Sequence, residues 1–237
     1  SLVLVVVETS QDAQHLANAL HFYLGQEHHL DAEGEADGQA DIPIIHLPDW
    51  ETLPYDSFSP HEDITSERLK ALSQLGDLNR GLLILPVQTL AHRLPPREHL
   101  DGQRFILNTG DQFDLHAERR RLEASGYHAV DTVREHGEFA VRGAILDVFP
   151  MGSEQPLRVE LFDTEIESLR AFDPDTQRTI TKVDSVTLLP AREIPLTETG
   201  IATFRQNWHE TFDGNPRDSS IYQDVSSGLA PPGVEYY

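Results

Sequence analysis

Apolar residues near the start of the chain form a continuous run and then recur at helical spacing. Leu2 to Val7 is almost entirely aliphatic, which is typical of a strand covered on both faces in a parallel sheet. Thr9 and Ser10 offer N-cap oxygens, and apolar residues then recur every three or four positions up to Leu24, which predicts a helix. Gly25 fits the exit from that helix, and the acidic residues 31–41 predict a surface loop.

The same order of elements is repeated further along the chain. Ile42–Leu47 is the next expected strand, Asp63–Leu75 carries leucines at intervals of three and is expected to be helical, and Gly81–Pro86 contains another aliphatic strand. Strand-helix-strand passes of this kind favour right-handed crossovers and a parallel sheet.

The pattern changes after Pro95 and Pro96 and a polar stretch that ends at Gln103. A strand, a helix over Leu115–Ser125 and a Gly126 suited to its C-terminal cap come next. Segments with period-two alternation follow, separated by turn residues that suit an antiparallel sheet: Glu138–Phe149, Leu157–Phe162, Glu165–Phe172 and Ile180–Leu189.

The sequence therefore predicts an α/β domain over residues 1–103, a smaller α+β domain with a mainly antiparallel sheet over 104–190, and a third segment over 191–237. That segment is expected to contain a helix around Ile201–Phe212. Tyr236 and Tyr237 end the chain, and we expect their packing partners to lie outside it. Because the chain lacks an initiator Met, we expect it to be part of a longer protein.

Alternation along Leu157–Phe162 separates two kinds of side chain. Leu157, Val159 and Leu161 share one face, and Arg158, Glu160 and Phe162 share the other. An arginine beside an aromatic residue on a polar face is typical of a protein-binding hot spot. The alternative is that Phe162 covers a helix or loop while Arg158 pairs with Glu160.

Two neighbouring features complete this pattern. Arg142 joins the same patch if its strand lies nearby, and Asp163-Thr164 has the length of a two-residue hairpin turn. Gly143 is expected to permit a bulge or a close backbone approach.

The negative charge of the chain favours a protein as binding partner over nucleic acid. The chain has 40 acidic and 18 basic residues and a formal net charge of −22, which disfavours nonspecific DNA binding because that depends on cationic contacts with phosphates. A protein partner is favoured, although the acidity is equally compatible with a solubility effect. No apolar run approaches the roughly 18 residues of a membrane span, and the absence of cysteine removes disulfide and thiolate chemistry.

Motifs for catalysis and cofactor binding are absent from the sequence. Neither a G-x-x-x-x-G-K-[ST] loop nor a G-x-G-x-x-G turn occurs, and no G-x-S-x-G motif is present. The histidines do not have metal-ligand spacing: His28 and His29 are adjacent, and His61 is not part of an H-E-x-x-H motif. We expect no catalytic, cofactor or metal site in this chain.

Three stretches resemble the bacterial transcription-repair coupling factors (Mfd). Residues 48–61, PDWETLPYDSFSPH, followed by Arg68-Leu69, are similar to a signature of that family. Residues 135–150, EHGEFAVRGAILDVFP, and 158–170, RVELFDTEIESLR, resemble the module that the family shares with the excision-repair protein UvrB. The resemblance covers nearly the whole chain and is weakest around residues 31–41.

The resemblance implies a helicase-like domain 1A without a phosphate loop, a domain 2 that contacts UvrA, and the start of domain 1B. It implies that Arg142, Arg158 and Phe162 contact UvrA, and we expect Glu160 and Asp163 at the periphery of that surface. The chain would then recruit nucleotide excision repair to RNA polymerase stalled at DNA damage, in the bacterial cytoplasm.

The resemblance also assigns activities to the longer parent protein. An ATP-dependent DNA translocase using ATP and magnesium is expected there, together with the regions that bind RNA polymerase and DNA. UvrB's long damage-probing hairpin has no room between Tyr55 and Arg68. The alternatives are a residual helicase-like nucleotide- or DNA-binding unit and an autoinhibitory module whose docking face is masked by the rest of the parent.

Overall fold

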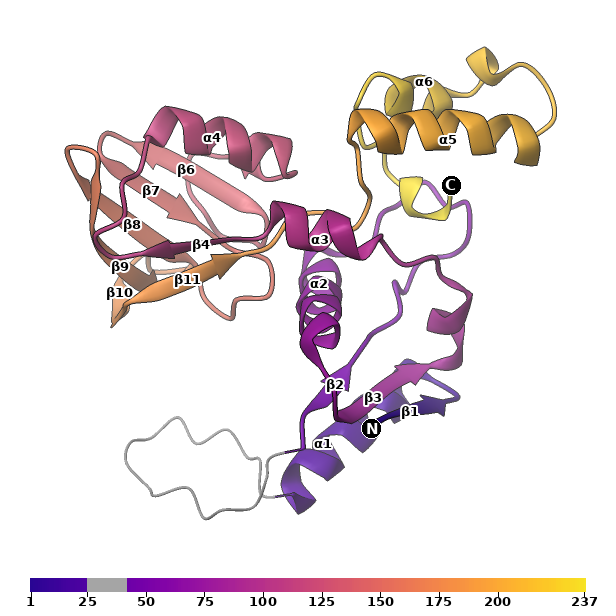
Figure 1. The fold of residues 1–237 in the computed structure, drawn as a ribbon, viewed down its shortest axis with the longest axis horizontal. Coiled ribbons are helices and arrows are strands. Elements are labelled where there is room, and N and C mark those ends of the chain that lie inside the picture. Colours follow the sequence, from indigo (N-terminus) through magenta and orange to yellow (C-terminus); the bar gives the residue numbers. More distant parts are fainter. Residues whose placement is uncertain (25–41) are drawn as a thin grey trace. The chain divides into compact units, whose positions relative to one another are not determined.

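The fold is described by a computed structural model that covers residues 1–24 and 42–237 (Figure 1). The expectations for Gly25 and for residues 31–41 fall outside the described residues. The chain divides into two compact units: residues 1–50 with 70–93, and residues 51–69 with 94–237. The boundaries expected at residues 103 and 190 stay predictions.

The first unit is built on a three-stranded parallel sheet with strand order β1-β3-β2. This confirms the expected α/β pattern. Thr9 accepts a hydrogen bond from the Asp12 backbone N–H and caps the first helix, whose Ala13 and Ala17 are buried beside Ile84. The elements of this unit are β1 (Leu2–Val7), α1 (Ser10–Tyr23), β2 (Ile44–His46), β3 (Gly81–Pro86) and the 3₁₀ helix η1 (Val87–Ala91).

Strand β1 is not covered on both faces, and that part of the prediction is wrong. Val5 and Val7 pack toward the α1 core, whereas Leu2, Leu4 and Val6 are 42%, 51% and 42% exposed. Among the residues that the structure describes, β1 lies at the edge of the sheet and pairs with β3 alone, so fewer neighbours cover it than cover the central strand β3. A run of aliphatic residues therefore identified the strand without revealing its place in the sheet.

Helix α2 (Glu62–Asp77) confirms the expected helix and is shared between the units, since residues 62–69 belong to the second and 70–77 to the first. Within the second unit, the fully buried Arg68 makes a two-pronged ion pair with Glu193. Its Nε and Nη2 lie 2.6 and 3.1 Å from the two carboxylate oxygens. Two buried charges are thus stabilised by each other.

The second unit contains a six-stranded sheet with order β10-β9-β8-β7-β6-β5. All its pairs are antiparallel except β5 with β6, which confirms the mainly antiparallel α+β pattern. The sheet strands are β5 (His128–Ala129), β6 (Glu138–Arg142), β7 (Ile145–Val148), β8 (Leu157–Phe162), β9 (Glu165–Phe172) and β10 (Thr179–Val183).

A two-stranded antiparallel ribbon and several helices complete this unit (Figure 1). Asp114 caps α4 by accepting from two backbone N–H groups, and Gly126 adopts a φ of 98° just after that helix, as expected of its terminus. The remaining elements are β4 (Phe105–Asn108), β11 (Ser185–Leu188), α3 (Arg97–Gln103), α4 (Leu115–Ala124), α5 (Glu198–Thr211), α6 (Ser220–Ser226), η2 (Pro216–Asp218) and η3 (Val234–Tyr236).

Several predictions in this unit need correction. Residues 138–149 form two strands joined at Gly143, which has a φ of 61° and occupies a hairpin turn and not a bulge. Residues 180–189 contribute to two different sheets through β10 and β11. The polar residues 97–103 form helix α3, which alternation and turn signals did not predict.

The terminal tyrosines have partners within the chain, contrary to expectation. The Tyr236 hydroxyl donates to the Thr52 carbonyl at 2.6 Å, and the Tyr237 ring stacks on Trp208 with centroids 5.6 Å apart. The partner Thr52 lies 184 positions earlier in the sequence, a separation that local patterns do not reveal. Within residues 1–24 and 42–237, none of the helices combines the length and apolar character that a membrane span requires.

Candidate functional site

The candidate site lies on one face of the six-stranded sheet, toward the end where two tight turns occur. β6 and β7 are joined by Gly143-Ala144, and β8 and β9 by Asp163-Thr164, so each turn has two residues. Asp163 has a φ of 57°, a conformation that aspartate tolerates better than most residues. The expected Asp163-Thr164 hairpin is therefore confirmed.

Strand β8 has the two faces that its alternation predicted. Leu157 and Val159 are 5% and 0% exposed, whereas Phe162 on the opposite face is 75% exposed. At this exposure Phe162 does not cover a helix or loop among the described residues of its own unit, contrary to the alternative considered from the sequence. A large aromatic side chain is held in solvent at the end of a well-packed strand.

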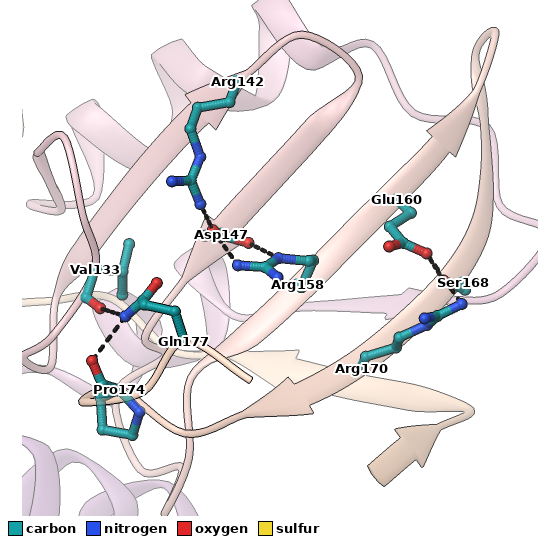
Figure 2. Close-up of polar contacts among 9 residues, drawn as sticks. All are labelled: Val133, Arg142, Asp147, Arg158, Glu160, Ser168, Arg170, Pro174 and Gln177. Carbon is teal, nitrogen blue, oxygen red and sulfur yellow. Dashed lines mark hydrogen bonds and ion pairs between the residues drawn. The ribbon is translucent and has the colours of Figure 1, made fainter. Parts of the chain in front are cut away.

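Arg142 and Arg158 are joined by a buried carboxylate that comes from the strand between theirs. Asp147 on β7 is directly opposite Arg158 on β8 and is 0% exposed. Its Oδ1 and Oδ2 accept from the Arg158 Nε and Nη2 at 2.7 and 2.9 Å, and its Oδ2 also accepts from Arg142. Figure 2 shows both guanidinium groups converging on this one side chain.

The two arginines differ in how far they reach into solvent. The Arg158 side chain is 18% exposed and that of Arg142 is 49% exposed. Arg158 also lies over the Phe172 ring, 4.9 Å from its centroid, and its hydrogen bonds to Asp147 are the main reason that its pKa is raised. Arg158 is thus a restrained cation and Arg142 a more accessible one.

Glu160 pairs with β9 and not with its strand neighbour Arg158. Its Oε2 accepts from the Ser168 hydroxyl at 2.6 Å and lies 3.3 Å from the Arg170 Nη2 (Figure 2). The alternative pairing considered from the sequence, Arg158 with Glu160, is therefore replaced by two separate ion pairs. Polar side chains of β6 to β9 thus form two neighbouring groups of cations and carboxylates on the face.

The other end of the same face is closed by a small core. Ala140, Phe149 and Phe172 are buried together with Val133. Gln177 holds the covering loops in place, because its Nε2 donates to the carbonyls of Val133 and Pro174 at 3.0 and 2.7 Å (Figure 2). This part of the face is therefore buried, whereas Arg142 and Phe162 at the turn end are accessible.

Sequence reasoning brought together Arg142, Arg158 and Phe162 but missed Asp147, Ser168 and Arg170. Asp147 offered a signal, since a charged residue between Leu146 and Val148 in an aliphatic strand requires a partner. That partner becomes visible only with the strand register, which pairs Asp147 with Arg158.

Known proteins resemble this chain both over the sheet and over most of its length. Residues 105–194 match the family model described as the UvrB interaction domain, so the sheet that carries the candidate face is a domain of that class. The chain is 50% identical to the transcription-repair-coupling factor of Escherichia coli K12 over 83% of its length. It is 50% identical to the Haemophilus influenzae protein of the same name over 81%, and 38% identical to that of Myxococcus xanthus over 83%. The chain belongs to the transcription-repair-coupling factor family, and it spans 17%, 17% and 16% of the length of these three relatives.

Proposed function

We propose that this chain is a protein-docking module that binds UvrA through Arg142, Arg158 and Phe162. In this role it recruits nucleotide excision repair to RNA polymerase stalled at DNA damage. Support comes from the family membership, from the UvrB interaction domain over residues 105–194, and from the chemistry of the face.

One observation carries the proposal: two arginines share the buried carboxylate of Asp147 on the same sheet face as a 75% exposed phenylalanine. Arginines and large aromatic residues are the side chains most enriched at protein-binding hot spots. An arginine that is already ordered loses less side-chain entropy on binding. Glu160 and Asp163 are the expected periphery, and Glu160 acts there by holding Arg170.

The experiment is calorimetric titration of the chain with purified UvrA. Arg158→Glu is expected to abolish binding, and Phe162→Ala to weaken it by at least about tenfold, or roughly 1.4 kcal/mol. Phe58→Ala is the matched control, since Phe58 is 67% exposed and lies outside the sheet. Folded Arg158→Glu protein that binds UvrA as tightly as the unmodified chain would contradict the proposal.

The wider role belongs to the parent protein. We propose that the parent is an ATP-dependent DNA translocase of the bacterial cytoplasm whose motor, polymerase-binding and DNA-binding regions lie outside these residues. This chain is then non-catalytic and binds neither ATP nor magnesium, in keeping with the absence of a phosphate-loop motif from its sequence. Saturable binding of ATP in a calorimetric titration would overturn that assignment.

A further inference from the structure

The face of the sheet that carries Arg142, Arg158 and Phe162 is the proposed docking face. A row of cations crosses it and continues beyond these three residues. Arg158 on β8 is directly opposite Arg170 on β9, and Arg170 is directly opposite Lys182 on β10. Residues directly opposite each other in an antiparallel pair share one face of the sheet. Three basic residues thus stand side by side in a chain with 18 basic and 40 acidic residues.

This arrangement is unfavourable for the isolated fold. Like charges directly opposite each other on neighbouring strands are destabilising. Asp147 compensates Arg158, and Glu160 compensates Arg170 at 3.3 Å. Lys182 adds a further cation next to Arg170, so that the row of positive charge continues to the β10 side of the face.

The β10 side is accessible to a partner. β10 is an edge strand of the sheet, its residues 179–182 are exposed, and the Arg170 side chain is 39% exposed. Asp163 and Glu165 lie around Phe162 at the turn, about 13 Å along the strand from the row at the usual rise per residue. A bound partner would therefore meet negative charge at the turn and positive charge along the row.

We propose that the docking face extends across Arg170 to Lys182, and that the partner places carboxylates against this row. The inference rests on the proposed function, because the row is continuous with Arg158. It adds the chemistry of the partner, an acidic surface, and two contact residues on β9 and β10. Lys182 lies at the rim and acts mainly on the rate of association, as rim charges do.

Lys182→Glu is the most informative variant. It is expected to weaken UvrA binding about fivefold to tenfold, mainly through a slower association rate, and to make the affinity less sensitive to salt. The new carboxylate stands opposite Arg170, so the melting temperature is expected to stay the same or rise. A merely structural role for Lys182 would instead lower the melting temperature.

The chain supplies its own control, because Lys70 is its only other lysine and is also exposed. Lys70→Glu produces the same change in net charge and is expected to leave the affinity within about twofold, because long-range charge effects are screened by salt. Arg170→Gln tests the middle of the row: the amide can still donate to Glu160, while the charge offered to the partner is lost.

The outcomes separate this inference from the proposed function. If Arg158→Glu abolishes UvrA binding while Lys182→Glu and Arg170→Gln both bind like the unmodified chain, the extension is wrong and the docking function stands. If the unmodified chain does not bind UvrA, both are overturned. Equal weakening by Lys182→Glu and Lys70→Glu would also refute the extension, since only the net charge would then matter.

Discussion

Replacement of Asp147 by asparagine tests whether the buried carboxylate organises the docking face. The carboxylate accepts two hydrogen bonds from Arg158, at 2.7 and 2.9 Å, and one from Arg142. Asparagine has nearly the same shape, but it keeps only one acceptor oxygen and has no charge. The substitution therefore removes the electrostatic anchor of both arginines with little change in volume.

The magnitude follows from the exposure of the two arginines. A hydrogen bond to a charged group contributes about 1.5–3 kcal/mol when buried, whereas an exposed ion pair contributes about 0–1 kcal/mol. The Arg158 side chain is 18% exposed and that of Arg142 is 49% exposed, so Arg158 dominates. Asp147→Asn is expected to lower the free energy of unfolding by about 2 kcal/mol.

Binding gives the more specific readout. UvrA affinity is expected to fall by about tenfold or more. The double variant Asp147→Asn with Arg158→Ala should bind only slightly worse than Arg158→Ala alone, because the contact of Asp147 with the more exposed Arg142 is then the one that remains to be lost. Urea denaturation and calorimetric titration measure the two effects. Asp131→Asn is the control, because it makes the same chemical change at an exposed aspartate of the same unit. A folded Asp147→Asn protein with an affinity within about twofold of the unmodified chain would refute the reasoning.

Three further predictions concern stability. Glu193→Gln leaves Arg68 buried without its carboxylate partner and is expected to cost about 3–5 kcal/mol in urea denaturation; a loss under about 1 kcal/mol would contradict the importance of this pair. Tyr127→Phe removes a buried hydroxyl that bonds two backbone groups and should cost about 1–3 kcal/mol by the same assay, whereas an unchanged unfolding free energy would argue against those bonds. Burial raises the pKa of Glu235 above the ordinary pKa of a glutamate. The folded state therefore becomes less stable as the pH rises through this range, because the buried carboxyl must ionise. Glu235→Gln should therefore be more stable than the unmodified chain at pH 7.5, with the advantage shrinking toward pH 4.5, and denaturation at both pH values measures this.

The faces of β8 were predictable from the sequence because strand alternation is a local property. Leu157 and Val159 had to lie on one side and Arg158 and Phe162 on the other once the segment was recognised as a strand. The register was not predictable in the same way. It decides that Asp147 lies opposite Arg158 and that Arg170 lies opposite Lys182, and it depends on pairing between separate segments.

The hairpin at Gly143 is marked in the sequence by a change in which positions, odd or even, carry the buried apolar residues. Along residues 138–149 the buried apolar side chains of one face fall at odd positions before the turn, at Phe139, and at even positions after it, at Leu146 and Val148. A continuous strand keeps the same parity, whereas a two-residue turn reverses it. The change in parity marks the turn, while the overall alternation suggested one long strand.

Two features depend on how distant segments are arranged and not on local sequence patterns. They are the exposure of an edge strand and the contacts made by the terminal residues. The aliphatic run of β1 is the same whether the strand is central or at an edge, and here it is at an edge. The contacts between Thr52 and Tyr236 likewise follow from how distant segments fold together. The sequence therefore predicted the residue types of the candidate face, whereas the residues that support it, such as Asp147 and Arg170, became visible only in the structure.

Hydrogen exchange of the chain with and without UvrA tests the central claim most directly, because it locates the binding face without any substitution. The account predicts that added UvrA slows amide exchange around the 143–144 turn and along β8 and β9, at residues 157–172. It predicts no change in helix α5, residues 198–211. Unchanged exchange throughout, or protection confined to α5 and other elements outside the sheet, would contradict the docking face described here.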